Sequence, residues 1–131
     1  MPLPRKTLGI LLAIYVAVLF CTALVLRDPM EQAQIHRTLF WGFHKGSQAL
    51  WSNLINIGAF VPVGLLVGLI AGKYRVLKAA AAGLFLSETF ECLQLITLRG
   101  VFDVDDLLTN LTGALLGGLA GALFVRLKSK G

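Results

Sequence analysis

The chain has 131 residues, of which 56% are hydrophobic, and a formal net charge of +5. Whole stretches of about twenty residues carry no formal charge, a pattern typical of integral membrane proteins and not of soluble domains. The basic residues stand mostly beside the apolar runs, and no aromatic or Arg-rich face accompanies them, which argues against nucleic acid as a partner. We expect a single domain over residues 1–131.

The apolar runs are long enough to cross a hydrocarbon core of about 30 Å as α-helices. The first follows a short basic lead, and we interpret it as a retained anchor because no A-x-A cleavage site ends it. Pro29 then stops the helix. We therefore predict an all-α, polytopic membrane protein with four transmembrane helices in a small bundle, at residues 8–26, 50–71, 76–98 and 107–127.

The connection over residues 27–49 mixes charges with aromatic side chains, which favours an amphipathic helix lying at the membrane interface. Trp41 and Trp51 suit the interfacial aromatic belt. His36 and His44 have no acidic company at metal-ligand spacing, so we expect surface histidines there and not a metal site.

The basic residues also predict the orientation. Under the positive-inside rule, the richer side faces the cytoplasm. Four spans place Arg27, Arg37, Lys45 and Arg99 on one side of the membrane and the following eight on the other: Arg5, Lys6, Lys73, Arg75, Lys78, Arg126, Lys128 and Lys130. We therefore expect both termini in the cytoplasm, with the connection around Arg99 on the outside.

Polar residues of three predicted helices fall at one depth, in the outer third of the membrane. In the third span, Ser87, Glu91 and Gln94 recur at i, i+4 and i+7 and so share one face. This common depth predicts an outward-opening polar cleft. Its candidate residues are Asn56, Glu91, Gln94, Arg99, Asp103, Asp106 and Asn110, with Asn53, Ser87, Glu88 and Asp105 as secondary candidates.

Glu91 is the central candidate, because a carboxylate in low dielectric needs a proton or a cationic partner. Arg99 is the nearest cation in the sequence, and the pair suggests proton handling or ligand binding. In the alternative interpretation these groups only hold the helices together. Arg99 would then pair with Asp103 or Asp105 in a solvated turn, while Asp105 or Asp106 would cap the fourth helix.

Known catalytic motifs are missing from the sequence. The acids supply enough oxygen ligands for Mg²⁺, but their spacing matches no known metal loop, so we expect no cofactor. There is no phosphate-binding loop, H-E-x-x-H helix or G-x-S-x-G elbow, and we assign no catalytic residue. Two alternatives stay open: a metal-dependent enzyme acting on lipid or isoprenoid phosphates, and a structural bundle or complex subunit. The glycine face of the fourth span, Gly113, Gly117 and Gly121, could pack within the bundle or between copies in an oligomer.

Three ordered blocks resemble the VanZ family of small bacterial membrane proteins: NLINIGAFVPVGLLVG (53–68), SETFECLQ (87–94) and RGVFDVDDLLTNLTGALLGG (99–118). An extra acid, Glu88, departs from the family pattern. The matching positions are Asn56, Phe60, Pro62, Gly64, Glu91, Gln94, Arg99, Asp103, Asp106, Asn110 and Gly113, and Gly117 continues the glycine motif.

What this resemblance implies is a cell-envelope protein of the bacterial cytoplasmic membrane. The family's namesake is associated with low-level resistance to teicoplanin, a lipoglycopeptide that binds peptidoglycan precursors at the outer face. The implied partners are membrane lipid and a peptidoglycan precursor, another lipid-linked ligand or the lipoglycopeptide. The polar cleft would bind or alter such a ligand.

Overall fold

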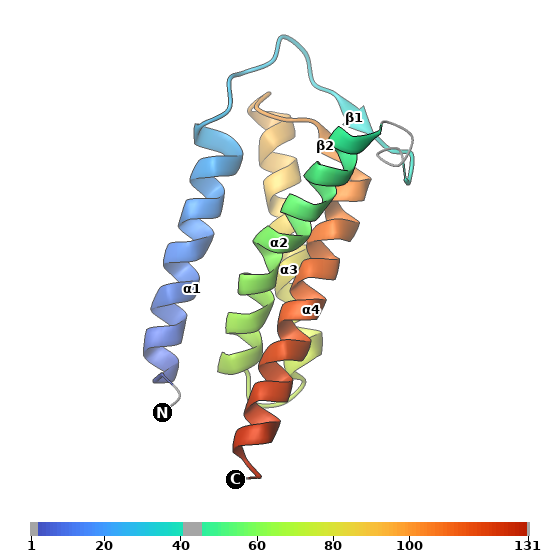
Figure 1. Ribbon diagram of the computed structural model, residues 1–131. Coiled ribbons are helices and arrows are strands. Elements are labelled where there is room, and N and C mark those ends of the chain that lie inside the picture. Colours follow the sequence, from blue (N-terminus) through green and yellow to red (C-terminus); the bar gives the residue numbers. More distant parts are fainter. Residues whose placement is uncertain (1–2, 41–45, 131) are drawn as a thin grey trace.

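The computed structural model describes residues 3–40 and 46–130 (Figure 1). Within these ranges four helices are long and apolar enough to cross a membrane, which confirms the all-α, four-helix prediction. The elements in chain order are α1 (Arg5–Phe20), its π-helical extension η1 (Cys21–Val25), β1 (Ile35–His36), α2 (Ser47–Ile70), α3 (Arg75–Ile96), β2 (Phe102–Asp103) and α4 (Val104–Lys128).

Helices α2, α3 and α4 form the body of the bundle, and α1 lies to one side of it (Figure 1). The two ends of the chain lie at one end of the bundle, which we call the terminus end, and β1 and β2 lie at the other, the strand end. A hydrogen bond fastens α1 to α2, since the Tyr15 hydroxyl donates to the Ala59 carbonyl at 2.9 Å.

Glycines allow α2 and α4 to approach backbone to backbone. A Cβ added to Gly64 would overlap the backbone of Ala114, and one added to Gly117 would overlap the Val61 carbonyl. Gly113 meets the Ile57 carbonyl in the same way. The glycine face of α4 therefore packs against α2 within the chain, as small residues do between membrane helices.

Small and aromatic side chains fill the centre of the bundle. Val63, Ala79 and Ala114 are completely buried, and the Phe60 and Phe90 rings meet edge to face with centroids 6.4 Å apart. Large apolar side chains cover much of the outside; Leu54, Ile55, Phe85, Leu119 and Leu123 are among the exposed ones. An apolar exterior around a polar-containing interior is the arrangement that a bilayer requires.

The connection between α1 and α2 differs from the prediction. Its described part, residues 27–40 and 46, holds no helix; β1 instead pairs in parallel with β2, with Ile35 opposite Phe102 and His36 opposite Asp103. The Phe102 amide donates to the Gln34 carbonyl at 3.0 Å. The loop backbone thus finds partners in the α3–α4 connection and needs no helix of its own. Trp41, His44 and Lys45 lie outside the described residues.

Candidate ligand-binding cavity

A cavity of about 230 Å³ lies between the four helices in the half of the bundle near the strand end. Its apolar wall includes Phe60 and Phe90. Its polar wall brings together predicted residues from α2, α3 and α4, namely Asn56, Glu91, Gln94, Asp106 and Asn110. Helices far apart in sequence therefore deliver their polar groups to one place.

Asn56 and Asp106 connect α2 to α4 at the cavity wall. The Asn56 Nδ2 donates to Asp106 Oδ1 at 2.7 Å. Both side chains are partly buried, where a hydrogen bond to a carboxylate oxygen is stronger than in water. The second asparagine of the predicted stripe, Asn53, is partly exposed and does not belong to the described lining.

Asn110 has an unused acceptor. Its Nδ2 donates to the Ser87 Oγ at 2.8 Å, which joins α4 to α3. Its Oδ1 is buried and has no hydrogen-bond partner in the described part of the chain. Because Asn110 lines the cavity, this oxygen is available to a donor that enters there.

Glu91 is 3% exposed, and its carboxylate binds the start of the fourth helix. Its Oε2 accepts a hydrogen bond from the backbone N–H of Asp103 at 2.9 Å. In the described residues no ion pair links Glu91 to Arg99, contrary to the sequence expectation. The carboxylate instead holds β2 beside α3.

The Arg99 guanidinium binds backbone carbonyls at the end of the first helix. Its Nη1 donates to the carbonyl of Arg27 at 2.6 Å, with longer contacts to those of Val25 and Leu24. Helix ends leave carbonyls without intrahelical partners, and a guanidinium carries several donors. Gln94 binds the same segment, because its Nε2 donates to the Ala23 carbonyl at 3.1 Å.

Asp103 caps the fourth helix. Its Oδ1 accepts from the Asp105 N–H at 2.9 Å, so α4 begins at Val104, and neither Asp105 nor Asp106 serves as the predicted cap. Its Oδ2 lies 3.5 Å from the Nδ1 of His36, which is half-buried and not a free surface histidine. Asp105 is buried and accepts from the Phe40 N–H at 2.7 Å.

A comparison of the whole chain with known families supports the family that these motif residues indicated. The family model described as VanZ/LLP1 matches residues 7–125. The chain belongs to the VanZ/LLP1 family. It is 39% identical over 62 residues to Protein VanZ of Enterococcus faecium, a match that covers 47% of this chain and 38% of that protein. The chain thus matches well under half of that relative's length, and no solved structure matches it.

In this VanZ/LLP1 chain the glycines and the polar residues of the motif fall into three structural groups, and the motif's Phe60 belongs to the apolar cavity wall. Gly64, Gly113 and Gly117 let α2 and α4 approach. Arg99 and Asp103 fasten the connections at the strand end and do not belong to the described cavity wall. The remaining polar motif positions line the cavity: Asn56, Glu91, Gln94, Asp106 and Asn110.

Arg27 is the lining residue that sequence reasoning missed. Among the described residues around the cavity, it alone carries a positive charge. Only its position in the sequence could have suggested this role: Arg27 follows the first predicted span and lies on the same predicted side of the membrane as the acidic residues. Glu88, the departure from the VanZ pattern, is exposed on α3 and does not belong to the described lining.

The acids of this VanZ/LLP1 chain are spread over the loop and the cavity. Across residues 3–40 and 46–130, no three His, Cys, Asp or Glu side chains gather closely enough to hold a metal ion.

Proposed function

We propose that this VanZ-like protein lies in the bacterial cytoplasmic membrane with its cavity toward the outer leaflet. There it binds the headgroup of a lipid-linked ligand, such as a peptidoglycan precursor, and lowers sensitivity to teicoplanin. The charge distribution supports the orientation, since the terminus end holds most of the Lys and Arg residues. Both termini are then cytoplasmic.

The observation that carries the proposal is the unpartnered Oδ1 of Asn110 in a cavity shared with Glu91 and Asp106. Buried acceptors without donors are rare, because each costs about 1–3 kcal/mol. A ligand with hydroxyl or amide N–H groups would supply the donor. Such groups are present in the sugars and peptides of envelope precursors.

Arg27 gives the cavity an affinity for an anionic group. Arg99 was expected to hold a phosphate or carboxylate, but its guanidinium is bound to backbone carbonyls. Arg27 is exposed, lines the cavity and is therefore the better candidate for this contact. Arginine donors match the geometry of phosphate and carboxylate oxygens.

The cavity volume limits the ligand. At about 230 Å³ it is smaller than the range of about 300–1,000 Å³ that holds a drug-sized molecule. A lipoglycopeptide is larger still. We therefore assign to the cavity one portion of a headgroup, such as a sugar–phosphate unit, and place the rest of the ligand outside it.

The test is the teicoplanin sensitivity of a susceptible bacterium that expresses the protein. Glu91→Gln is expected to abolish the shift in sensitivity at unchanged membrane abundance. Glu88→Gln is the matched control, because it removes the same charge one helical turn away, outside the described cavity lining. An intact phenotype in both Glu91→Gln and Asn110→Ala would refute the proposal. A fall in abundance with Glu91→Gln would favour a purely structural role.

The orientation has its own test. Reporter fusions at the two ends of the chain should both be active on the cytoplasmic side. An outward terminus would place the cavity in the inner leaflet and overturn the proposal of an outer-leaflet ligand.

A further inference from the structure

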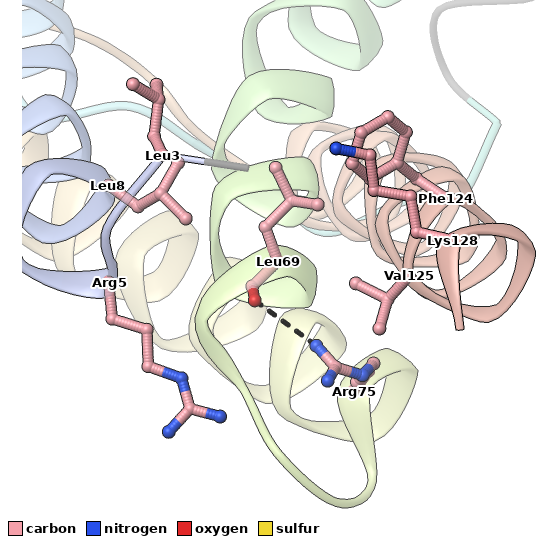
Figure 2. A pocket seen from close by; sticks show the side chains of 8 residues that line it. All are labelled: Leu3, Arg5, Leu8, Leu69, Arg75, Phe124, Val125 and Lys128. Atoms are coloured by element: carbon pink, nitrogen blue, oxygen red, sulfur yellow. Dashed lines mark hydrogen bonds between the residues drawn. The ribbon is translucent and has the colours of Figure 1, made fainter. Parts of the chain in front are cut away.

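A second, larger hollow lies at the terminus end of the bundle, away from the proposed ligand cavity. Its volume is about 400 Å³, within the range of small-molecule sites. Figure 2 shows its lining side chains: Leu3 and Leu8 lie on one side, Phe124, Val125 and Lys128 on the other, and Leu69 and Arg75 between them. We call it the basal groove.

The walls of the basal groove are apolar. Leu3 comes from the segment before α1, Leu8 from α1, Leu69 from the last turn of α2, and Phe124 and Val125 from α4. Such walls can pack closely against a hydrocarbon chain, as apolar surfaces do inside a membrane.

Three basic side chains accompany these walls: Arg5, Arg75 and Lys128. The Arg75 Nη1 donates to the Gly68 carbonyl at 2.6 Å and to the Leu69 carbonyl at 3.2 Å, at the end of α2 (Figure 2). The other two guanidinium nitrogens take no part in these contacts. The Lys128 Nζ lies 5.4 Å from the centre of the Phe124 ring. No ion pair neutralises any of the three in the described ranges 3–40 and 46–130.

The acidic side chains of the sequence lie away from the basal groove. All the acidic residues fall within residues 28–31 and 88–106, in the other half of the bundle. The terminus end carries only basic ionisable residues of the Lys, Arg, Asp and Glu types. An anion that enters the groove would complement the three basic side chains.

We propose that the basal groove binds an anionic phospholipid. One acyl chain lies along Leu8, Leu69 and Val125, and the phosphate lies among Arg5, Arg75 and Lys128. Basic pockets between transmembrane helices are recognised sites for anionic lipid headgroups. A free phosphate would gain nothing from the leucine walls, and a zwitterionic lipid would leave the excess of positive charge in place.

Lipid binding can be measured by fluorescence on the full chain in nanodiscs. Phe124→Trp places an indole in the groove, with Trp41 and Trp51 replaced by Phe. The probes are phosphatidylglycerol and phosphatidylcholine with the same brominated acyl chains, because bromine quenches an indole that it contacts. Quenching is expected at a lower mole fraction of phosphatidylglycerol than of phosphatidylcholine.

Charge removal then tests the assignment of the phosphate. Arg5→Gln and Lys128→Gln should each weaken the preference for phosphatidylglycerol about fivefold, as expected for one basic group near an anionic lipid. Arg5→Lys, which keeps the charge, should retain the preference. The matched control is Arg126→Gln with Lys130→Gln, which removes two charges at the same end but outside the described lining.

Three results would overturn the proposal. The first is equal quenching by the two lipids. The second is an equal loss of preference in the Arg126→Gln, Lys130→Gln control, which would reveal a diffuse charge effect. The third is displacement of the lipid by inorganic phosphate, which would make the groove an anion site. None of these results bears on teicoplanin sensitivity, so this proposal and the proposed function fail separately.

Discussion

The Glu91 carboxylate accepts a hydrogen bond from the backbone N–H of Asp103, 2.9 Å away. Asp103 in turn caps α4 and lies beside His36 of β1. Glu91 therefore has two separable properties, an ionisable group in the cavity and an acceptor for the α3–α4 connection. Substitutions can remove one and keep the other.

Glu91→Gln keeps the acceptor, while Glu91→Leu removes it. We expect Glu91→Leu to lower the free energy of unfolding by about 1–3 kcal/mol, because the Asp103 N–H would be left without its partner. Glu91→Gln should cost clearly less. Unfolding of the detergent-solubilised protein, followed by circular dichroism, measures both. Equal losses would mean that Glu91 matters to stability through its charge.

The Asn56–Asp106 hydrogen bond should couple α2 to α4. A double-mutant cycle with Asn56→Ala and Asp106→Ala is expected to give a coupling free energy of about 1 kcal/mol, within the range of polar contacts between membrane helices. The same cycle with Asn53→Ala and Asp106→Ala should be additive, since no hydrogen bond joins these two described residues. A coupling free energy between Asn53 and Asp106, with none between Asn56 and Asp106, would contradict the Asn56–Asp106 hydrogen bond.

The glycines of α2 should differ sharply in their tolerance of a methyl group. Gly64→Ala would press against the backbone of Ala114, whereas a Cβ at Gly58 meets nothing within 4 Å. We expect Gly64→Ala to destabilise the bundle by about 1–3 kcal/mol, as overpacking does, and Gly58→Ala to be neutral. Thermal stability of the purified variants checks this. Similar stability of the two would argue against the close approach of α2 and α4.

Arg99→Ala should loosen the end of the first helix, since Arg99 donates to carbonyls of residues 24, 25 and 27. Amide hydrogen exchange around η1 is expected to accelerate about fivefold, which corresponds to about 1 kcal/mol. Arg37→Ala is the control, because Arg37 is an exposed cation of the α1–α2 connection and is not among the residues bonded to η1 in the described contacts. Unchanged amide exchange in Arg99→Ala would indicate that the hydrogen bond from Gln94 to the Ala23 carbonyl holds η1 in place without Arg99.

Periodicity and composition were sufficient to predict the helices and much of the cavity wall. Ser87, Glu91 and Gln94 repeat on one face, and the structure buries all three. This worked because a membrane leaves few places for polar side chains, so polar residues at one depth tend to meet. The VanZ motifs include two of these positions, Glu91 and Gln94, and so identified them a second time.

The contacts of Arg99 could not be predicted in this way. A sequence shows charged side chains, and pairing Arg99 with Glu91 was the natural inference. Its observed partners are backbone carbonyls of η1 and of Arg27 just after it, and backbone carbonyls belong to every residue and leave no mark in the sequence. The pairing of β1 with β2 was missed for a related reason, since two-residue strands are too short to show an alternation.

The parallel pairing of β1 with β2 has a consequence for biogenesis. The α1–α2 connection leaves the ribosome well before the segment that it pairs with, and α2 likewise precedes α4, its glycine-mediated partner. The loop around His36 therefore stays unpaired until the α3–α4 connection, which contains β2, has been synthesised. A chain truncated before β2 would lack both the partner of this loop and the Asp103 N–H that binds Glu91, so both contacts depend on synthesis of the α3–α4 connection.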